Sequence, residues 1–305
     1  MNTQLPFVSV IVPVYNNKKQ LQCCLQALQD QTYDKSLFEV IVVDNNSTEE
    51  LKSVLDKFSD ARLIFEAESG SYAARNKGIT VARGEVFAFT DSDCIPNSRW
   101  IENGIKSLEF GQIDLVGGKI VFLFSPQKTT AEVFDSITAL QVKKNIETRQ
   151  LTVTANLFAY KYVFDAIGLF DASLRSGGDF KWTKKATEAG FKLVYAPKAE
   201  ILHPARDFRS LLKKGYRVGT GQLDIQLDQD IALSTILIKS FRDLFPPTPW
   251  GYWRFICASG SDEARYRFAK IWAIAWVCNI ALSLGRLSSL IKKLANTGNT
   301  IYSKK

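Results

Sequence analysis

Short apolar runs rich in β-branched residues alternate with amphipathic stretches along the first third of the chain. The runs predict four strands, at residues 7–15, 38–45, 61–67 and 85–91. The stretches between them predict three helices, at residues 18–31, 49–59 and 71–84. Strands that are apolar along their whole length and are joined by helices are typical of a parallel sheet covered on both faces. The pattern therefore predicts an α/β fold.

Two of the predicted helices carry more specific signals. The helix at 18–31 places its apolar residues on one face: Leu21, Cys24, Leu25 and Leu28. The helix at 49–59 follows Ser47 and Thr48, and either side-chain oxygen can accept from the free N–H groups of a first helical turn. We therefore expect one of these two residues to cap that helix.

Polar residues stand where three of the predicted strands end. The first strand runs into Tyr15 and Asn16, the second into Asp44, and the fourth into Asp91-Ser92-Asp93. In open α/β sheets, ligands bind beyond the carboxyl ends of the strands. A lone aspartate at such a place is often only a helix cap, and this interpretation suits Asp44 taken alone. Three strand ends that converge on one crevice favour a ligand site.

Asp91 and Asp93 are separated by one residue at the end of an apolar strand. Alternate side chains of an extended segment point the same way, so the two carboxylates can face one hard cation. The alternative is a pair of solvated turn aspartates. No G-x-G-x-x-G follows the first strand and no G-x-x-x-x-G-K-[ST] occurs in the chain. A phosphorylated ligand would then need a metal ion and a cation such as Arg75.

Four segments in this order resemble the inverting family 2 glycosyltransferases of GT-A fold: VSVIVPVYNN, VIVVDNNST, AARNKGI and FTDSD. Two later segments, TANLFAYKYVFDAIGLFDASLRSGGDFKW and AGFKLVYAPKAEILH, resemble the acceptor half of the same family. The resemblance covers about residues 7–220. It implies a single Rossmann-like domain with a mostly parallel sheet, followed by a C-terminal helical extension.

The resemblance also implies roles for the donor side of the site. A nucleotide-sugar would lie against residues of three strand ends and one helix, namely Pro13, Tyr15, Asn16, Asp44, Arg75, Asp91 and Ser92. Asp44 would accept a hydrogen bond from the base, and Arg75 would reach the base or the diphosphate unless it is an exposed helix charge. Mg²⁺ or Mn²⁺ would bridge the diphosphate oxygens and be bound by Asp93. Asp91 would contact the same metal or the ribose, and His203, the single histidine, would bind the metal or the diphosphate. The alternative for His203 is a structural role.

On the acceptor side, the resemblance assigns the catalytic base to Asp179 in SGGDFKW. Gly178 stands where the family often has Glu, and a glycine there would let the backbone approach the sugar. Asp179 can equally cap the helix that follows it. Trp182 would stack on an acceptor sugar or pack into the core, and the sequence leaves both open.

Features outside these motifs indicate a nonprocessive enzyme. The family's processive synthases carry Q-x-x-R-W and several membrane spans, and this chain has neither. The segment 209–222 is basic and amphipathic. Together with the preceding Arg206, its Arg209 and Arg217 would attract a diphosphate or a lipid-linked acceptor, or the segment is a solvated basic helix. The expected reaction transfers a sugar, with UDP-sugar as the first choice of donor, to a glycan or lipid-linked acceptor.

The positive charge of the chain is confined to its last third. The net charge is +8, but residues 206–305 hold 16 Lys and Arg against 7 Asp and Glu, whereas residues 1–205 hold 23 against 24. The most apolar window, 272–285, lies in this region. Lys270 and Arg286 bound 15 uncharged residues there, fewer than the roughly 20 that span a bilayer. The window is a buried helix, an interfacial helix or a marginal span, and its tryptophans and basic flanks favour an interfacial helix with a membrane surface as partner. An exposed aromatic platform for nucleic acid is not indicated.

These observations predict two regions and a cellular location. The glycosyltransferase region is expected at 1–222, with a nucleotide-sugar half at about 1–120 and an acceptor half at about 121–222, and a helical basic region at 223–305. Five cysteines without a C-x-x-C pair fit a reducing compartment. The apolar run near the N-terminus is the length of a strand and is broken by Pro13, so we expect no signal peptide. We expect a cytoplasmic protein, peripheral on the inner face of the membrane.

Two other functions fit parts of the sequence. A sugar nucleotidyltransferase has a related architecture, but it needs a glycine-rich loop after the first strand, where this chain has PVYNNKKQ. A catalytically inactive glycan- or lipid-binding module would not need Asp91, Asp93, Asp179 and His203 together.

Overall fold

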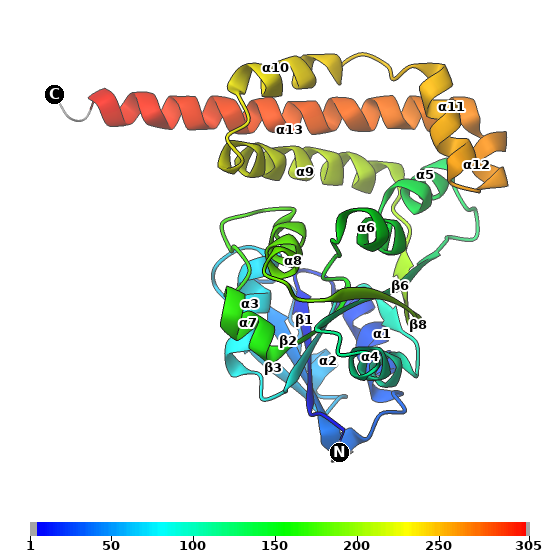
Figure 1. Cartoon of the computed structure of the whole chain (residues 1–305), viewed down its shortest axis with the longest axis vertical. Coiled ribbons are helices and arrows are strands. Elements are labelled where there is room, and N and C mark those ends of the chain that lie inside the picture. Colours follow the sequence, from blue (N-terminus) through cyan, green and yellow to red (C-terminus); the bar gives the residue numbers. More distant parts are fainter. Residues whose placement is uncertain (1–4, 303–305) are drawn as a thin grey trace. The chain divides into compact units, whose positions relative to one another are not determined.

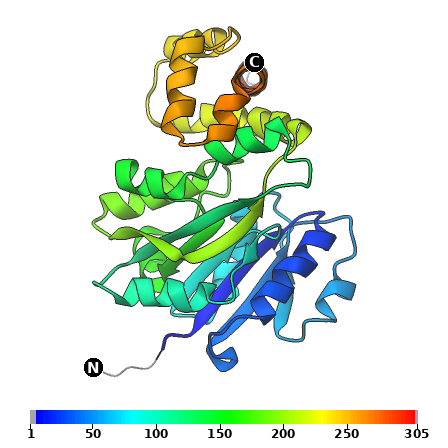
Figure 2. The ribbon, with the colours of Figure 1, turned by 90° about the vertical axis from the view of Figure 1, so that its right-hand side faces the viewer.

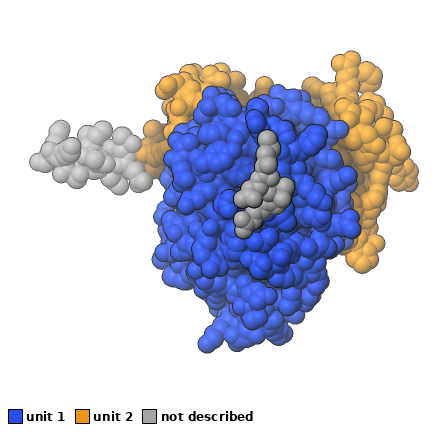
Figure 3. All heavy atoms as spheres, turned by 60° about the horizontal axis from the view of Figure 1, so that its bottom comes forward, with its two compact units in different colours: residues 1–123, 140–173, 178–204 blue, residues 124–139, 174–177, 205–305 orange. Residues whose placement is uncertain are grey.

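The computed structural model describes residues 5–302, with side-chain surroundings for residues 5–294. The chain forms two compact units, which Figure 3 colours separately. Unit 1 contains residues 1–123, 140–173 and 178–204, and unit 2 contains residues 124–139, 174–177 and 205–305. The region boundary predicted at residue 222 lies inside unit 2 and stays a prediction for the extent of the enzymatic region. The outer ends of the predicted regions, residues 1 and 305, lie outside the described residues.

Unit 1 is built on an eight-stranded sheet of order β3-β2-β1-β4-β7-β6-β8-β5. The strands are β1 (Val8–Val14), β2 (Phe38–Asp44), β3 (Ala61–Phe65), β4 (Val86–Thr90), β5 (Ile95–Pro96), β6 (Leu115–Leu123), β7 (Asn156–Tyr160) and β8 (Leu193–Pro204). The first four are parallel to one another, as predicted. β7 is antiparallel to β4 and β6, and β5 is antiparallel to β8, whereas β6 and β8 are parallel.

Helices cover both faces of the parallel part of this sheet (Figures 1 and 2). The helical segments of unit 1 are α1 (Lys18–Gln29), the 3₁₀ turn Lys35–Leu37, α2 (Lys52–Leu55), α3 (Ser71–Val81), α4 (Trp100–Glu109), α6 (Val142–Arg149), α7 (Lys161–Ile167) and α8 (Gly178–Glu188). Because side chains alternate along a strand, Val10 packs in one cluster with Leu25 of α1 and Trp100 of α4. Its neighbour Ile11 faces α3, where a Cβ added to Gly78 would lie 2.5 Å from Ile11 Cγ2.

The four predicted strands and three predicted helices are all present, but one helix, its cap and one edge of the sheet differ from the prediction. The buried residues of α1 are the four that its periodicity predicted. The helix predicted at 49–59 is shorter, Lys52–Leu55, and the predicted cap is wrong: Ser47 Oγ instead accepts a hydrogen bond from the Asn16 N–H at 3.0 Å. The edge strand β3 exposes Leu63 and Phe65, so the prediction of two covered faces fails there.

Unit 2 is helical. It contains α5 (Thr130–Thr138), α9 (Phe208–Asp228), α10 (Leu233–Arg242), α11 (Pro249–Ala258), α12 (Asp262–Tyr266) and α13 (Phe268–Tyr302). Its core joins residues of α5, α9, α11, α12 and α13. α9 and α13 pack backbone to backbone, because a Cβ added at Gly219 would lie 2.0 Å from the Leu282 carbonyl oxygen and one at Gly285 would lie 2.1 Å from that of Tyr216. Only glycine permits this approach.

A buried carboxylate holds part of the basic stretch of α9 in place. Asp135 of α5 is fully buried and contacts Arg206 Nη1 at 3.3 Å and Lys214 Nζ at 3.2 Å. Burial, followed by the nearby Arg206 charge, lowers the pKa of Lys214 to about 8. Arg206 before α9 and Lys214 within it are therefore paired with one internal carboxylate and are not solvated charges. The attraction of a diphosphate or lipid-linked acceptor by Arg209 and Arg217 stays a prediction.

The apolar window predicted at 272–285 lies within the longer helix α13. Residues Phe268–Leu294 of this helix are long and apolar enough to cross a membrane, judged by length and composition alone. In the sequence, the uncharged part of this window ends at Arg286. That side chain is fully buried and forms an ion pair with Asp243, which follows α10. The charge that seemed to end the window is therefore neutralised inside unit 2.

Candidate active site

The loop after β4 carries the two aspartates of the FTDSD segment to the carboxyl edge of the sheet. The Cys94 N–H donates to the Asp91 carbonyl oxygen at 3.0 Å, which turns the chain into the two-residue strand β5. β5 pairs antiparallel with β8, with Ile95 opposite Leu202. The next position in this register brings Cys94 opposite His203. The short β5–β8 pairing thus joins residues that are far apart in the sequence.

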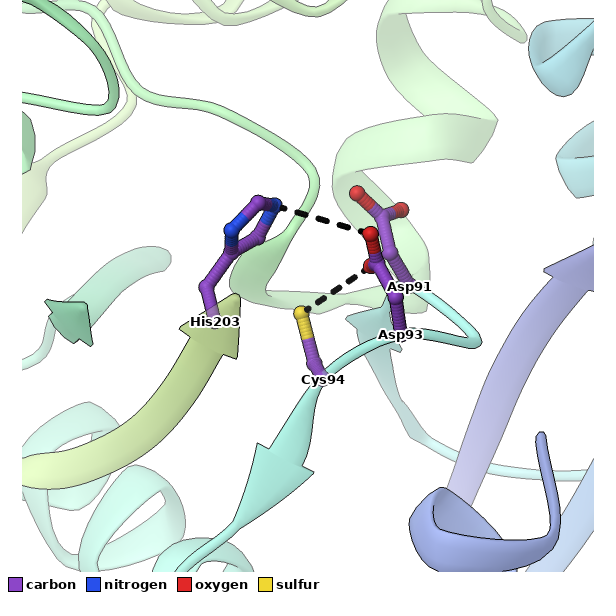
Figure 4. A group of neighbouring side chains, drawn as sticks. All are labelled: Asp91, Asp93, Cys94 and His203. Carbon is purple, nitrogen blue, oxygen red and sulfur yellow. Dashed lines mark hydrogen bonds and ion pairs between the residues drawn. The ribbon is translucent and has the colours of Figure 1, made fainter. Parts of the chain in front are cut away.

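Four side chains gather here: Asp91, Asp93, Cys94 and His203 (Figure 4). One ligand atom from each lies within 4.8 Å of the ligand atoms of the other three. His203 Nε2 lies 3.9 Å from Asp93 Oδ2, and Cys94 Sγ lies 3.8 Å from Asp93 Oδ1. Asp91 and Asp93 are partly exposed, whereas His203 and Cys94 are buried. The predicted convergence of Asp91, Asp93 and His203 is therefore present in the structure.

The orientation of His203 favours a ligand role for one of its nitrogens. Its Nδ1 lies 2.8 Å from the Pro204 carbonyl oxygen. A carbonyl only accepts, so this bond assigns the proton to Nδ1, and in the neutral ring Nε2 is then the acceptor nitrogen. Nε2 is the atom that faces Asp93. Metal-binding histidines are commonly fixed by such a bond from the other nitrogen.

The donor set fits a divalent cation. Two carboxylates and one imidazole nitrogen are ligands that suit Mn²⁺, and carboxylates alone suit Mg²⁺. Cys94 adds a sulfur atom, but burial raises the pKa of its thiol well above the usual value, with the nearby Asp91 and Asp93 charges adding to the effect. The carboxylate oxygens and the imidazole nitrogen are the harder donors of this set and are the ones that suit Mn²⁺ or Mg²⁺.

Arg75 of α3 is buried beside this cluster. Its side chain is 5% exposed, and its Nη2 lies 2.5 Å from Asp91 Oδ1. The guanidinium also lies over the Tyr72 ring, with its central carbon 5.7 Å from the ring centre. The alternative of an exposed helix charge is therefore wrong. Contact of Arg75 with a base or diphosphate stays a prediction.

Tyr72 links α3 to Asp179 at the start of α8. The Tyr72 hydroxyl donates to Asp179 Oδ1 at 3.1 Å, and the Phe180 N–H donates to the same oxygen at 2.9 Å. Burial raises the pKa of Asp179, while the Arg75 charge and these hydrogen bonds partly oppose the rise. α8 begins at Gly178, so Asp179 lies within its first turn. It is not at the N-cap position of the alternative role, although its carboxylate accepts from an N–H of that turn.

Gly178 is in contact with the Tyr72 ring. A Cβ added to Gly178 would lie 2.8 Å from Cε2 of Tyr72. A glutamate at this position would therefore collide with the ring. Tyr72 thus occupies the space that a longer side chain at position 178 would need.

Trp182 packs in the core of unit 1. It is 3% exposed, its ring stacks on Phe164 at a centroid distance of 4.2 Å, and its indole N–H donates to the Gly168 carbonyl oxygen at 2.7 Å. Of the two roles that the sequence left open, this geometry favours packing. Stacking on an acceptor would require the ring to leave these contacts.

The remaining predicted residues lie around the ends of β1 and β2. Pro13 is buried in β1, whereas Tyr15 is 62% exposed. Asn16 Oδ1 accepts from the Thr48 N–H at 2.8 Å, and Asp44 Oδ1 accepts from the Ser47 N–H at 2.9 Å. Asp44 therefore holds the turn after β2 and does not cap α2, which was the alternative role.

Ser92 connects this region to the loop after β4. Its hydroxyl oxygen accepts from Asn17 Nδ2 at 3.1 Å. The hydrogen bonds of Asn16 and Asn17 thus tie the ends of β1, β2 and β4 together, as the convergence of three strand ends predicted.

Two residues near the cluster were missed by the sequence analysis. Tyr72 precedes Arg75 by three positions on α3, which places both on one helix face. Cys94 directly follows Asp93. The helical spacing was a usable signal for Tyr72. Nothing in the sequence indicated that Tyr72 contacts Gly178 and Asp179.

Comparisons with known proteins identify the family of the chain. The sequence profile of glycosyl transferase family 2 matches residues 9–161. Glycosyltransferase AglE of Haloferax volcanii is 41% identical over 96% of this chain and 99% of its own length. A Methanococcus voltae enzyme, dolichyl N-acetyl-alpha-D-glucosaminyl phosphate 3-beta-D-2,3-diacetamido-2,3-dideoxy-beta-D-glucuronosyltransferase, is 24% identical over 63% of this chain and 64% of its own length.

A solved structure has a similar fold. The mannosyltransferase PcManGT from Pyrobaculum calidifontis, in complex with GDP-Man and Mn²⁺, matches with a TM-score of 0.60 at 20% identity, over 96% of this chain and 88% of its own. Together with the mixed sheet of unit 1, this match shows the predicted GT-A fold. The chain therefore belongs to glycosyltransferase family 2 and is a glycosyltransferase.

Proposed function

We propose that the chain is a nonprocessive, inverting glycosyltransferase that moves a sugar from a nucleotide-sugar to a hydroxyl group of a lipid-linked glycan. The observation that carries the proposal is the continuous set of contacts from His203 and Asp93 through Asp91, Arg75 and Tyr72 to Asp179. This set unites four potential cation ligands with a buried carboxyl group. An inverting transfer needs a base for the acceptor proton, and a cation can stabilise the leaving diphosphate.

The proposed reaction assigns separate roles to the two ends of this set. The acceptor oxygen attacks the anomeric carbon, the bond from that carbon to the diphosphate oxygen breaks, and the hydroxyl proton passes to Asp179. Burial raises the pKa of Asp179, which makes its carboxylate a better proton acceptor. Tyr72 orients Oδ1 through its hydroxyl group.

Asp91, Asp93 and His203 would hold Mn²⁺ or Mg²⁺. A cation there supplies a Lewis acid that neutralises the charge growing on the leaving nucleoside diphosphate. Arg75 fixes Asp91 through the ion pair and brings a second positive charge to the same place. Pro13, Tyr15, Asn16, Asp44 and Ser92 would border the nucleotide, and Gly178 would border the acceptor.

The proposals for the donor and for the acceptor rest on different relatives of the chain. UDP-sugar stays the first choice, and GDP-sugar is the second because the structurally similar mannosyltransferase holds GDP-Man. A lipid-linked acceptor is supported by the name of the Methanococcus relative, which specifies a dolichyl-linked sugar phosphate. We also propose that the protein is cytoplasmic and associates with the inner face of the membrane through its basic last third.

The test is thermal unfolding with UDP-, GDP- and dTDP-sugars, each with and without Mn²⁺. A true donor raises the melting temperature by mass action, and the rise should require the cation. Release of nucleoside diphosphate in the presence of lipid-linked sugars then measures transfer. Binding of a donor without any transfer or hydrolysis would favour the inactive binding module over the enzyme.

A further inference from the structure

The outer face of α10 and the loop after it expose a stripe of large apolar side chains. Ile238 and Phe245 are each 70% exposed, and Phe241 between them is 57% exposed. Their spacing of three and four residues puts them on one side of the helix and its continuation. Trp250, at the start of α11, is 66% exposed. We call these four residues the α10–α11 stripe. Single exposed apolar residues are common on proteins, but groups of them usually mark an interaction site.

The opposite face of α10 is fixed within unit 2. Ile236 and Ser240 are buried, and the Ser240 carbonyl oxygen accepts from Ser283 Oγ of α13 at 2.7 Å. Asp243, just after α10, pairs with the buried Arg286. The orientation of α10 is therefore determined by specific contacts, and the exposure of the α10–α11 stripe is a consequence of that orientation.

The tryptophans of α13 hold the loop that carries the rest of the stripe. Trp272 Nε1 donates to the Pro247 carbonyl oxygen at 2.7 Å, and Trp276 Nε1 donates to that of Leu244 at 2.8 Å. Both indole N–H groups are thus used inside unit 2. The sequence had assigned these two tryptophans to the membrane interface, but in the structure they support the loop that presents Phe245.

Cationic side chains accompany the stripe. Residues 231–258 contain three cations, Lys239, Arg242 and Arg254, and one carboxylate, Asp243. Asp243 forms an ion pair with the buried Arg286 and lies 3.9 Å from Arg242 Nε. The Arg242 side chain is 74% exposed, and the Arg254 guanidinium lies 5.3 Å from the centre of the Trp250 ring. Exposed apolar and aromatic residues beside an excess of positive charge suit the headgroup region of an anionic bilayer.

We propose that the α10–α11 stripe is the part of the protein that inserts into an anionic lipid surface, with Lys239, Arg242 and Arg254 at the level of the phosphates. This inference rests on the proposed membrane association. It places the membrane contact in the α10–α11 stripe, whereas the sequence favoured residues 272–285 for that contact. In the structure α13 is the support: Ile271 and Ala275 lie in the core of unit 2. Truncation before α13 would remove this core, so point variants of the full chain are the appropriate test.

The experiment is co-sedimentation of the full-length protein with vesicles of phosphatidylcholine mixed with phosphatidylglycerol, and with vesicles of phosphatidylcholine alone. The variant Ile238→Ser/Phe241→Ser/Phe245→Ser removes three exposed apolar side chains, and we expect each to weaken binding about tenfold. Two controls carry the same chemical change elsewhere: Leu284→Ser/Ile291→Ser on exposed positions of α13, and Phe65→Ser/Phe110→Ser in unit 1. Both should bind anionic vesicles like the unchanged protein.

Three results would overturn the proposal: equal binding by the triple variant, loss of binding in the α13 control, or no binding of the unchanged protein to anionic vesicles at low salt. A change from dimer to monomer in the triple variant, measured by light scattering, would identify the stripe as a contact between copies of this chain and would also refute it. Mn²⁺-dependent binding of UDP or GDP, measured on the same proteins, reports separately on the proposed enzyme function.

Discussion

Gly178 and Tyr72 are packed so closely that a single added carbon would lie 2.8 Å from the tyrosine ring. The family often has a glutamate at the position of Gly178. In this chain the Tyr72 ring fills that space and its hydroxyl group reaches Asp179. Tyr72 of α3 is thus a polar partner of Asp179.

This packing predicts a coupled pair of substitutions. Gly178→Glu should lower the melting temperature because the new side chain collides with Tyr72. The loss should be smaller when Tyr72→Ala has already removed the ring. A double-mutant cycle of unfolding free energies measures the coupling, and additive effects of the two changes would contradict the contact.

Tyr72→Phe should move the acidic limb of the pH–rate profile to higher pH. The Tyr72 hydrogen bond lowers the pKa of Asp179, so its removal raises a pKa that burial has already raised. A base works only when deprotonated, and turnover would then be lost at a higher pH as the medium is acidified. The profile of nucleoside diphosphate release against pH is the measurement, with Tyr162→Phe, an exposed tyrosine on α7, as control.

Asp179→Asn should lower turnover by roughly 10²–10⁴-fold, because the amide cannot take the acceptor proton. Donor binding, measured by calorimetry, should be retained. Near-normal turnover would exclude Asp179 as the base, and Asp165 and Asp171 would be tested next.

The same substitution should not lower stability at neutral pH. The pKa of Asp179 is higher in the folded chain than in the unfolded chain. At pH values between these two pKa values the unfolded chain binds fewer protons than the folded chain, so the free energy of unfolding falls as the pH rises. Asparagine removes this cost. We expect the melting temperature of Asp179→Asn to equal or exceed that of the unchanged protein at pH 7, and a clear decrease would show that the carboxylate is needed for folding.

Asp93→Ala should abolish the Mn²⁺ dependence of nucleoside diphosphate binding and leave the fold intact. Asp93 is partly exposed, so its loss creates no buried cavity, and it contributes an oxygen to the cation site. His203→Ala should weaken the same dependence. Isothermal titration with and without Mn²⁺ is the measurement, with Asp60→Ala on an exposed loop as control. Unchanged Mn²⁺ dependence in Asp93→Ala would refute the metal assignment.

Cysteine alkylation should separate the thiols by burial. Cys23 and Cys257 are exposed, whereas Cys24 and Cys94 are buried and burial raises the pKa of both thiols. At pH 8, iodoacetamide should label the first two and spare the second two until urea is added. Peptide mass spectrometry gives the result, and rapid labelling of Cys94 in the folded protein would show that the cation site opens.

The sequence was most informative where function and local pattern coincide. The alternating apolar runs predicted β1, β2 and β4. The position of Asp91 and Asp93 at the end of an apolar strand predicted that they lie at the carboxyl edge of the sheet. Arg75 and Asp179 were found by motif. What the sequence could not supply were contacts between distant segments: the collision of Gly178 with Tyr72, the pairing of Arg286 with Asp243, and the bonds of Trp272 and Trp276 to the loop. These depend on how helices pack, and residue type alone does not encode them.

The pairing of β5 with β8 has a consequence for the unfolding of unit 1. Asp93 and His203 are 110 positions apart in the sequence, and the strand that joins their neighbourhoods has only two residues. An ion that binds both side chains only in the folded chain would stabilise this contact between distant segments by its binding free energy. Removing the ion would withdraw that stabilisation, and the first part of the sheet to separate on heating would then be its β5 edge.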